Sequence, residues 1–302
     1  MTILGIETSC DETSAAVIQS GRVKANLIYT QKIHEQYGGV IPELSGRAHL
    51  QKISPLVKTA LKNASVSMEE IDVVAATAGP GLIGSLIVGY NFAQGLALSL
   101  GVPFVAVNHI EGHIYSGFLM DSKPEFPALI LVVSGGHTLL LKVESHTSYT
   151  VLGTTIDDAV GEAFDKVSKL LGLGYPGGPK IQAAADAGEQ GDIRFPIADV
   201  SGDYNFSYSG LKTSVLRYMQ KTFVQKEATA EEINNVAYAF QDSAITALTK
   251  KIEKALSEEN YKSISAAGGV AANKLLRERL AEIAEKFNLP LVMPAFEYCT
   301  DN

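Results

Sequence analysis

Two histidines four positions apart, His109 and His113, are the residues best placed by type and spacing to do chemistry. On a helix this spacing puts both imidazoles on one face, about one turn apart, where they can hold one transition metal from the same side. Two histidines on a helix surface are the common alternative. However, a strand of buried type over residues 104–107 leads directly into the pair, and active sites of α/β folds lie where such strands end. The pair is therefore interpreted as part of a metal site.

A metal site of this kind needs a third ligand. Asp301 is the strongest candidate, because residues 299–302 follow a final predicted strand as His109 follows an earlier one. Cys299 is a softer alternative, and its ordinary role is that of a small buried apolar residue. The pair is not the HExxH of zinc peptidases, since Ile110 occupies the glutamate position, and no Pro-Cys-x-x-Cys of a zinc deaminase follows. Imidazole with carboxylate suits iron or zinc, whereas magnesium prefers oxygen ligands.

Two strand–turn–strand units have unusual turns, at residues 5–13 and 133–138. Gly135 and Gly136 let the second turn approach a ligand closely with its N–H groups inward, which suits phosphate. Asp11 and Glu12 in the first turn could hold a cation or orient a nucleophile. Plain hairpin turns also contain Ser, Asp and Gly. Because the two turns occupy matching places in the two halves of the chain, they favour a nucleotide site, although no GxxxxGK[ST] loop is present.

Other glycine-rich segments have two interpretations each. At residues 268–273, a strand-to-helix junction, a base or ribose could lie against the backbone with Asn273 available for hydrogen bonds, and close packing explains the glycines equally well. For residues 79–84 we favour a tight turn with close packing. Residues 174–179 and 205–212 are candidate substrate loops or turn-rich connections.

Three carboxylates, Asp158, Glu162 and Asp165, fall at i, i+4 and i+7 of a helix predicted over residues 158–171. Like charges at this spacing destabilise a helix by a few tenths of a kcal/mol. The pattern predicts either a solvated acidic face or a carboxylate that meets the hydroxyls of a ligand.

The predicted elements follow one order, strand–strand–strand–helix–strand–helix, in both halves of the chain. The first half has strands at residues 3–7, 15–19, 23–30, 73–77 and 104–107 and helices at 42–63 and 83–100. The second has strands at residues 129–133, 138–143, 149–152, 264–267 and 291–293 and helices at 158–171, 231–258 and 270–287. The repeat predicts two α/β lobes, residues 1–125 and 126–302, with a ligand cleft between them.

Composition narrows the class of protein. The chain has 302 residues, 46% of them hydrophobic and 19% charged, as in ordinary globular proteins. A net charge of −8 disfavours a generally basic nucleic-acid coat but permits a local basic groove. The two cysteines are no disulfide framework and suit a reducing cytoplasm. Neither a signal peptide nor a membrane span is predicted, so we expect a cytoplasmic protein with no membrane partner.

The sequence resembles the TsaD family, proteins of tRNA threonylcarbamoyladenosine biosynthesis once described as glycoprotein endopeptidases. The matching segments span nearly the whole chain, at residues 5–13, 79–84, 108–113, 133–138, 162–169, 174–179, 205–213, 268–273 and 299–302. The resemblance implies an actin-like, sugar-kinase-like (ASKHA) two-lobe fold, with duplicated RNase H-like domains around a central cleft. It also implies transfer of a threonylcarbamoyl group from threonylcarbamoyl-AMP to adenosine 37 of tRNAs that read ANN codons.

The resemblance further implies which residues do this work. The metal ligands would be His109, His113 and Asp301, holding one divalent metal per subunit, with Fe(II) favoured and Zn(II) or Mg(II) as alternatives. Asp11 and Glu12 fall in a segment implicated in activity. Ligand binding would involve Val132, Val133, Ser134, Gly135, Gly136, Asp165, Gly178, Gln182 and Asn273. Gln182 stands where many relatives carry an acidic residue, which alters one contact to a ligand hydroxyl. A further helix is expected after residue 302, and its loss would weaken the structural support of Asp301.

The main hypothesis for the mechanism is metal-assisted carbamoyl transfer. The metal would polarise the mixed anhydride, backbone N–H groups of residues 134–136 would stabilise developing charge, and the adenine amine would attack and release AMP. The alternatives are a metallopeptidase, disfavoured by Ile110, and a non-catalytic nucleotide-binding scaffold, which has no need of the metal ligands. The resemblance implies two protein partners, a TsaB-like paralogue that docks on the first lobe and a TsaE-like ATPase.

Overall fold

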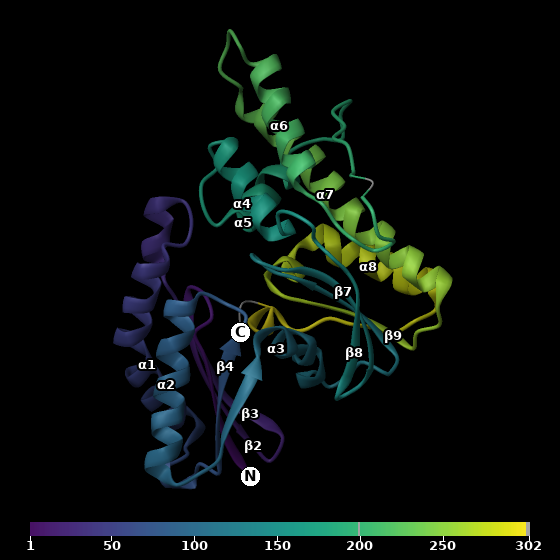
Figure 1. Ribbon diagram of the computed structural model, residues 1–302. Coiled ribbons are helices and arrows are strands. Elements are labelled where there is room, and N and C mark those ends of the chain that lie inside the picture. The colour runs from purple at the N-terminus through teal and green to yellow at the C-terminus, as the bar shows by residue number, and fades with distance from the viewer. Residues whose placement is uncertain (199, 300–302) are drawn as a thin grey trace. The chain divides into compact units, whose positions relative to one another are not determined.

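The computed structural model describes residues 1–198 and 200–299, which form two α/β units (Figure 1). The first unit runs from Met1 to Tyr115 and the second begins at Ser116. The predicted boundary after residue 125 falls between η3 (Gly117–Leu119) and β6 (Ala128–Val133). Each unit contains one five-stranded mixed sheet, which confirms the predicted α/β class.

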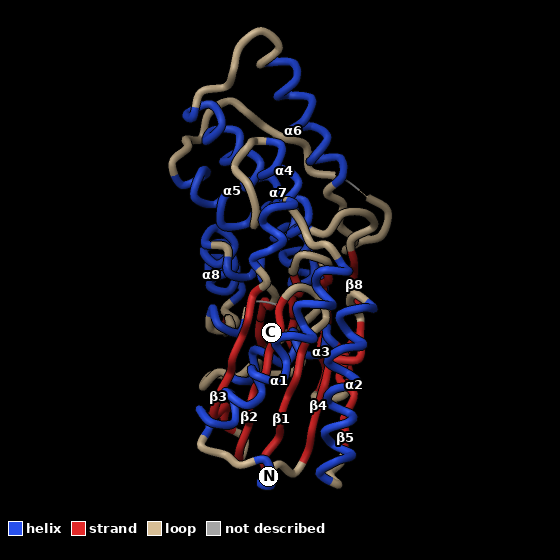
Figure 2. The backbone as a smooth tube through the Cα atoms, turned by 90° about the vertical axis from the view of Figure 1, so that its left-hand side faces the viewer, coloured by secondary structure: helices blue, strands red, loops and turns tan. Residues whose placement is uncertain are grey.

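The sheet of the first unit has the strand order β3-β2-β1-β4-β5, seen side by side in Figure 2. Its strands are β1 (Thr2–Glu7), β2 (Glu12–Gln19), β3 (Arg22–Thr30), β4 (Val73–Gly79) and β5 (Phe104–Asn108). The first three are antiparallel neighbours joined by tight turns, and β4 and β5 run parallel to β1. Parallel strands need crossover helices, and the chain supplies them before β4 and before β5.

The helices over residues 42–64 and 83–100 cover one face of this sheet. The helical elements are η1 (Lys32–Tyr37), α1 (Pro42–Ala64), η2 (Met68–Glu70), α2 (Ile83–Leu100) and α3 (His109–Ser116). Leu4 and Ile6 of β1 are buried in the core with α1 and α2. Side chains alternate along a strand, so Glu7 of β1, Ser14 of β2 and Thr77 of β4 project from the opposite face.

Helix α2 is long and apolar enough to cross a membrane by length and composition alone. In the structure it lies beside β4 (Figure 1). It buries a stripe of small residues, which includes Gly89, Ala93 and Ala97. Any side chain at Gly89 would collide with Thr8, so the glycine lets the helix approach the end of β1 closely. The Leu82 N–H donates to the Ser9 carbonyl over 2.7 Å, which confirms the close packing predicted for residues 79–84.

The second unit has the strand order β10-β9-β6-β7-β8. The remaining strands are β7 (Thr138–Ser145), β8 (Ser148–Thr154), β9 (Ser263–Ala267) and β10 (Leu291–Val292). The helices are α4 (Val160–Leu170), α5 (Gly177–Asp186), α6 (Ser209–Thr222), α7 (Ala230–Glu258), η4 (Gly269–Ala272), α8 (Lys274–Phe287) and η5 (Phe296–Tyr298). Every residue of the central strand β6 is buried, as its unbroken apolar sequence predicts.

The long helix predicted over residues 231–258 is confirmed as α7. Thr229 begins it with a capping box, in which its hydroxyl accepts from the Glu232 N–H and the Glu232 carboxylate accepts from the Thr229 N–H. Its apolar face is buried in the core of the second unit, at Val236, Phe240, Ala244, Leu248 and Ile252. This face anchors the core of the second unit.

Several predicted boundaries were wrong in the second unit. The helix predicted from residue 158 begins at Val160, so Asp158 precedes it. The helix predicted over residues 270–287 is divided, because Asn273 ends η4 and caps α8. Helices α5 and α6 begin in segments that were predicted as loops, because their first turns contain Gly, Pro and Ser. Carboxylates from other segments stabilise these first turns, Asp165 for α5 and Asp157 for α6.

A buried polar network joins α1 and η1 to the first turn of the chain. The imidazole of His49 donates from Nε2 to the Cys10 carbonyl (2.9 Å) and accepts at Nδ1 from the Thr13 hydroxyl (2.8 Å). Next to it, His34 donates from Nε2 to the side-chain oxygen of Gln31 (2.9 Å). The two bonds of His49 use the neutral form of its ring. The network therefore fixes the backbone that precedes Asp11.

The state of His49 predicts a pH dependence of stability. Burial lowers the pKa of His49 below 6.5, and it outweighs the Cys10 carbonyl and the carboxylates of Glu7 and Asp11, which act in the opposite direction. Below pH 6.5 the unfolded chain takes up a proton at this site more readily than the folded chain. The free energy of unfolding therefore decreases as the pH is lowered below 6.5. In urea titrations at several pH values, His49→Gln should lose less stability below pH 6.5 than the unsubstituted protein. His146→Gln, at an exposed hairpin position, is the control, and equal slopes for all three proteins would contradict the prediction.

Candidate functional site

The predicted histidine pair lies at the beginning of α3, directly after β5. His109 is 6% exposed and His113 is 4% exposed, and their ring centroids are 4.6 Å apart with the ring planes at 76°. The side-chain oxygen of Asn108 begins the helix by accepting from the Ile110 N–H over 2.8 Å. The spacing thus brings both imidazoles to one buried face, as the sequence predicts.

A carboxylate that the sequence analysis did not single out contacts the pair. Glu7 ends β1, and its Oε2 lies 3.2 Å from Nδ1 of His109. The Ser9 hydroxyl lies 3.2 Å from the same nitrogen. The Glu7 carboxylate also accepts hydrogen bonds from the Ser9 N–H and from the Thr77 hydroxyl. The only sequence signal was an acidic residue at the end of an otherwise apolar strand.

The two candidates for a third metal ligand have different outcomes. Asp301 lies outside the described residues. Cys299 is buried in the core of the second unit, where Arg277 donates to its sulfur over 3.3 Å and burial raises the pKa of its thiol. This environment is that of a structural cysteine rather than of a thiolate ligand. Within residues 1–198 and 200–299, no group of three His, Cys, Asp or Glu side chains could hold a metal ion.

Hydrogen bonds to the neighbouring strand hold the first turn. The Thr30 hydroxyl donates to the Glu12 carboxylate over 2.6 Å, and the Gln31 N–H donates to the Asp11 carbonyl over 3.1 Å. By strand alternation, Glu12 projects from the same sheet face as Glu7. The turn is therefore tied to β3 on one side and to the His49 network on the other.

Two close backbone approaches fix the second turn, between β6 and β7. The Ser134 N–H donates to the His137 carbonyl over 2.9 Å and closes the turn. A Cβ atom at Gly161, in the first turn of α4, would lie 2.5 Å from the Ser134 carbonyl oxygen. At Gly268, where φ is +90°, a Cβ atom would collide with the Val133 carbonyl. Only glycine permits both contacts, so the α4 and β9 segments clamp the turn.

The other predicted ligand residues connect the beginnings of the surrounding helices. The Asp165 carboxylate accepts from the Gly177 N–H over 2.6 Å, at the start of α5 and next to Gly178. The side-chain oxygen of Gln182 accepts from the Lys274 N–H over 2.8 Å at the start of α8. Asn273 caps the same helix through the Leu276 N–H (3.1 Å) and donates to Gln241 (2.8 Å). Contacts between the elements thus link the second turn, Asp165, Gln182 and Asn273 within one unit.

Of the three carboxylates predicted for one helix face, only Glu162 and Asp165 lie on α4, because Asp158 precedes its first residue. Asp158 forms ion pairs with Lys166 (2.8 Å) and Lys212 (2.6 Å). Burial acts to raise the pKa of Asp158, but the hydrogen bonds from the two lysines outweigh it, so the pKa is lowered. Glu162 also pairs with Lys166. Asp158 and Glu162 therefore share Lys166, whereas the Asp165 carboxylate accepts from the Gly177 N–H.

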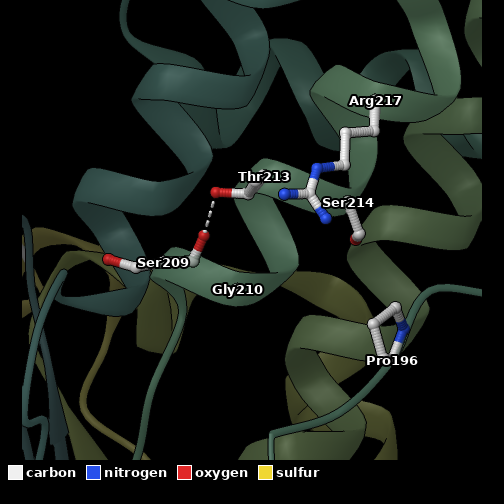
Figure 3. A pocket seen from close by; sticks show the side chains of 6 residues that line it. All are labelled: Pro196, Ser209, Gly210, Thr213, Ser214 and Arg217. Atoms are coloured by element: carbon white, nitrogen blue, oxygen red, sulfur yellow. Dashed lines mark hydrogen bonds between the residues drawn. The ribbon is translucent and has the colours of Figure 1, made fainter.

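Asp157, which the sequence analysis did not single out, explains the segment at residues 205–212. Its carboxylate accepts from the N–H groups of Tyr208 (2.8 Å) and Ser209 (3.2 Å) and from the Ser207 hydroxyl (2.5 Å), which begins α6. Beyond this turn, α6 borders a cavity of about 570 Å³ (Figure 3). Its lining consists of Pro196, Ser209, Gly210, Thr213, Ser214 and Arg217. None of the predicted metal or nucleotide residues is among them.

Comparison with solved structures identifies the fold. The HypF protein of T. kodakarensis superposes with a TM-score of 0.66 at 16% identity, over 99% of this chain and 46% of that one. Component A of the Acidaminococcus fermentans (R)-2-hydroxyglutaryl-CoA dehydratase gives 0.56 at 14% identity, over 99% of this chain and 96% of that one. The chain has their actin-like, sugar-kinase-like fold, as predicted.

Comparison of sequences identifies the family. The model of the TsaD family, tRNA N6-adenosine threonylcarbamoyltransferase, matches residues 22–302. The enzymes of that name from Caldicellulosiruptor saccharolyticus and Fervidobacterium nodosum are each 48% identical, over 100% of this chain and 90% of their own length. These relatives support neither the peptidase nor the scaffold alternative. The chain therefore belongs to the TsaD family of tRNA N6-adenosine threonylcarbamoyltransferases.

Proposed function

We propose that the chain takes its threonylcarbamoyl group from threonylcarbamoyl-AMP and delivers it to N6 of adenosine 37 in tRNAs that read ANN codons. In this reaction N6 attacks the carbamoyl carbon, the bond from that carbon to the phosphate oxygen breaks, AMP leaves with the electron pair, and N6 loses a proton. The observation that supports a metal-assisted form of this chemistry is the buried imidazole pair of α3. Asp11 and Glu12 are assigned to orient the attacking amine.

The donor set fits a transition metal better than magnesium. His109 and His113 offer two imidazole nitrogens on one buried face. The Glu7 carboxylate contacts Nδ1 of His109, which leaves Nε2 of that ring for the metal. We assign Asp301 as the third ligand and favour Fe(II), with Zn(II) as the alternative. When bound, the metal supplies Lewis-acid polarisation of the carbamoyl or phosphate oxygens.

The clamped turn at residues 132–136 is assigned to the nucleotide end of the donor. Its backbone N–H groups between Ser134 and Gly136 would stabilise negative charge on phosphate, because they are fixed before the ligand arrives. Asp165, Gly178, Gln182 and Asn273 are assigned to the sugar and base. We further propose action in the cytoplasm with a TsaB-like paralogue, which docks on the first unit, and a TsaE-like ATPase.

Replacing the histidines tests the metal assignment. His109→Ala and His113→Ala should each lose the stoichiometric metal and slow threonylcarbamoyl transfer roughly a hundredfold or more, since Lewis-acid assistance contributes several kcal/mol. Elemental analysis and transfer of labelled threonine to tRNA measure the two effects. His146→Ala, at an exposed position of the second unit, should retain both properties. A histidine variant with the rate and metal content of the unsubstituted protein would exclude the metal's role.

Replacing one glycine tests the assignment of the second turn. An alanine at Gly161 must displace the Ser134 carbonyl, because the added Cβ would lie 2.5 Å from it. Gly161→Ala should weaken AMP binding, measured by calorimetry, by about tenfold or more, since one misplaced backbone donor is worth more than 1 kcal/mol. Metal content should not change. Gly191→Ala, where no atom lies within 4 Å of the added Cβ, is the control. Equal AMP affinity in both variants would refute the assignment.

A further inference from the structure

The buried carboxylate of Glu7 lies behind the candidate metal ligand His109. Glu7 is 6% exposed, and its Oε2 is 3.2 Å from Nδ1 of the imidazole. Resting on the proposed metal site, we propose that Glu7 is a positioning residue, which fixes the tautomer and direction of His109 so that Nε2 faces the metal.

The tautomer follows from the chemistry of the contact. The Glu7 oxygens already accept hydrogen bonds from the Ser9 N–H and the Thr77 hydroxyl, so in the contact with Glu7 the donor is Nδ1–H of His109. The Ser9 hydroxyl, 3.2 Å from the same nitrogen, then accepts a share of this hydrogen bond. A neutral imidazole with hydrogen on Nδ1 has its lone pair on Nε2. A carboxylate hydrogen-bonded to the other nitrogen also makes the ligating nitrogen a stronger electron donor.

The carboxylate is itself held rigidly. The Ser9 N–H and the Thr77 hydroxyl donate to its two oxygens, and the His109 ring is a third donor. These groups come from the end of β1, the end of β4 and the beginning of α3, so the position of the ring is coupled to the sheet. Burying a carboxylate costs several kcal/mol unless its oxygens are hydrogen-bonded, and all three donors serve this purpose.

A second observation supports a polar ligand on this face of the sheet. Ser14 lies directly opposite Glu7 in the β1–β2 register, and its side chain therefore projects from the same face. The Ser14 hydroxyl is buried and has no hydrogen-bond partner among the described residues. Buried hydroxyls are nearly always hydrogen-bonded in native structures, and a water or an oxygen ligand of a metal would supply the missing partner.

The tautomer can be measured without any metal. In metal-free protein labelled with ¹⁵N in its histidines, the ring nitrogens report which of them carries the hydrogen. We expect His109 to be the Nδ1–H tautomer, whereas free histidine favours Nε2–H. In Glu7→Gln the amide has one acceptor oxygen for three donors, so the tautomer should shift towards the Nε2–H form. Unchanged ring signals in Glu7→Gln would overturn the positioning role.

Metal affinity provides the second measurement. Loss of a carboxylate behind a ligating histidine weakens metal binding roughly 10- to 100-fold, and Glu7→Gln should lose affinity within this range in a chelator competition. The absorption bands of the cobalt-substituted protein should also shift. Glu43→Gln, which removes an exposed carboxylate paired with Arg47, should change neither readout. Thermal unfolding of both variants separates a loss of folding from a loss of positioning.

The two measurements distinguish the inference from the proposed function. If His109 has the expected tautomer but the protein binds no metal through His109 and His113, the metal proposal fails and the positioning of the ring stands. If metal binds through the pair and Glu7→Gln has unchanged affinity and cobalt spectrum, the positioning role fails and the metal proposal stands.

Discussion

Both candidate sites lie where strands end, and both bury polar groups there. Burial of a polar group costs free energy unless the group is hydrogen-bonded, and this constraint shapes both sites. In the first unit, the Glu7 carboxylate is tolerated because N–H and O–H groups from three segments donate to it. In the second unit, the carbonyls of the clamped turn meet two glycines, where any larger residue would collide. Both arrangements are rigid without a ligand. Rigid donors and ligands of this kind stabilise charge without first having to reorganise.

Local sequence patterns predicted the elements whose stability is local. The apolar run of β6 and the apolar face of α7 follow from strand and helix periods, and the structure confirms both. The four-residue spacing of the histidines is also local, which is why the sequence revealed the buried pair. The start of α5 was missed because it needs the Asp165 carboxylate, twelve positions earlier in the chain, to accept its first N–H. No local period encodes such a partner.

Two carboxylates act on partners far away in the sequence, which is why the sequence alone did not reveal their roles. Glu7 meets Thr77 across 70 positions and His109 across 102 positions. Asp157 reaches the start of α6 across 51 positions. Each carboxylate has the sequence context of a polar turn beside a strand, because no residue close to it in the sequence indicates its partner. A charged residue at the end of an apolar strand was the available signal, and the topology decides what it meets.

Gln182 illustrates how one position can serve the scaffold and a ligand separately. Its side-chain oxygen accepts from the Lys274 N–H at the start of α8. A carboxylate at this position would accept the same hydrogen bond and add an interaction with the helix N-terminus of about 0.3–1 kcal/mol. The amide therefore keeps the contact that joins α5 to α8. It differs from an acid by its NH₂ group, which can donate to a ligand oxygen where a carboxylate only accepts. In the proposed ligand site, an amide at this position would offer an N–H donor that a carboxylate lacks, while its oxygen keeps the contact that positions α8.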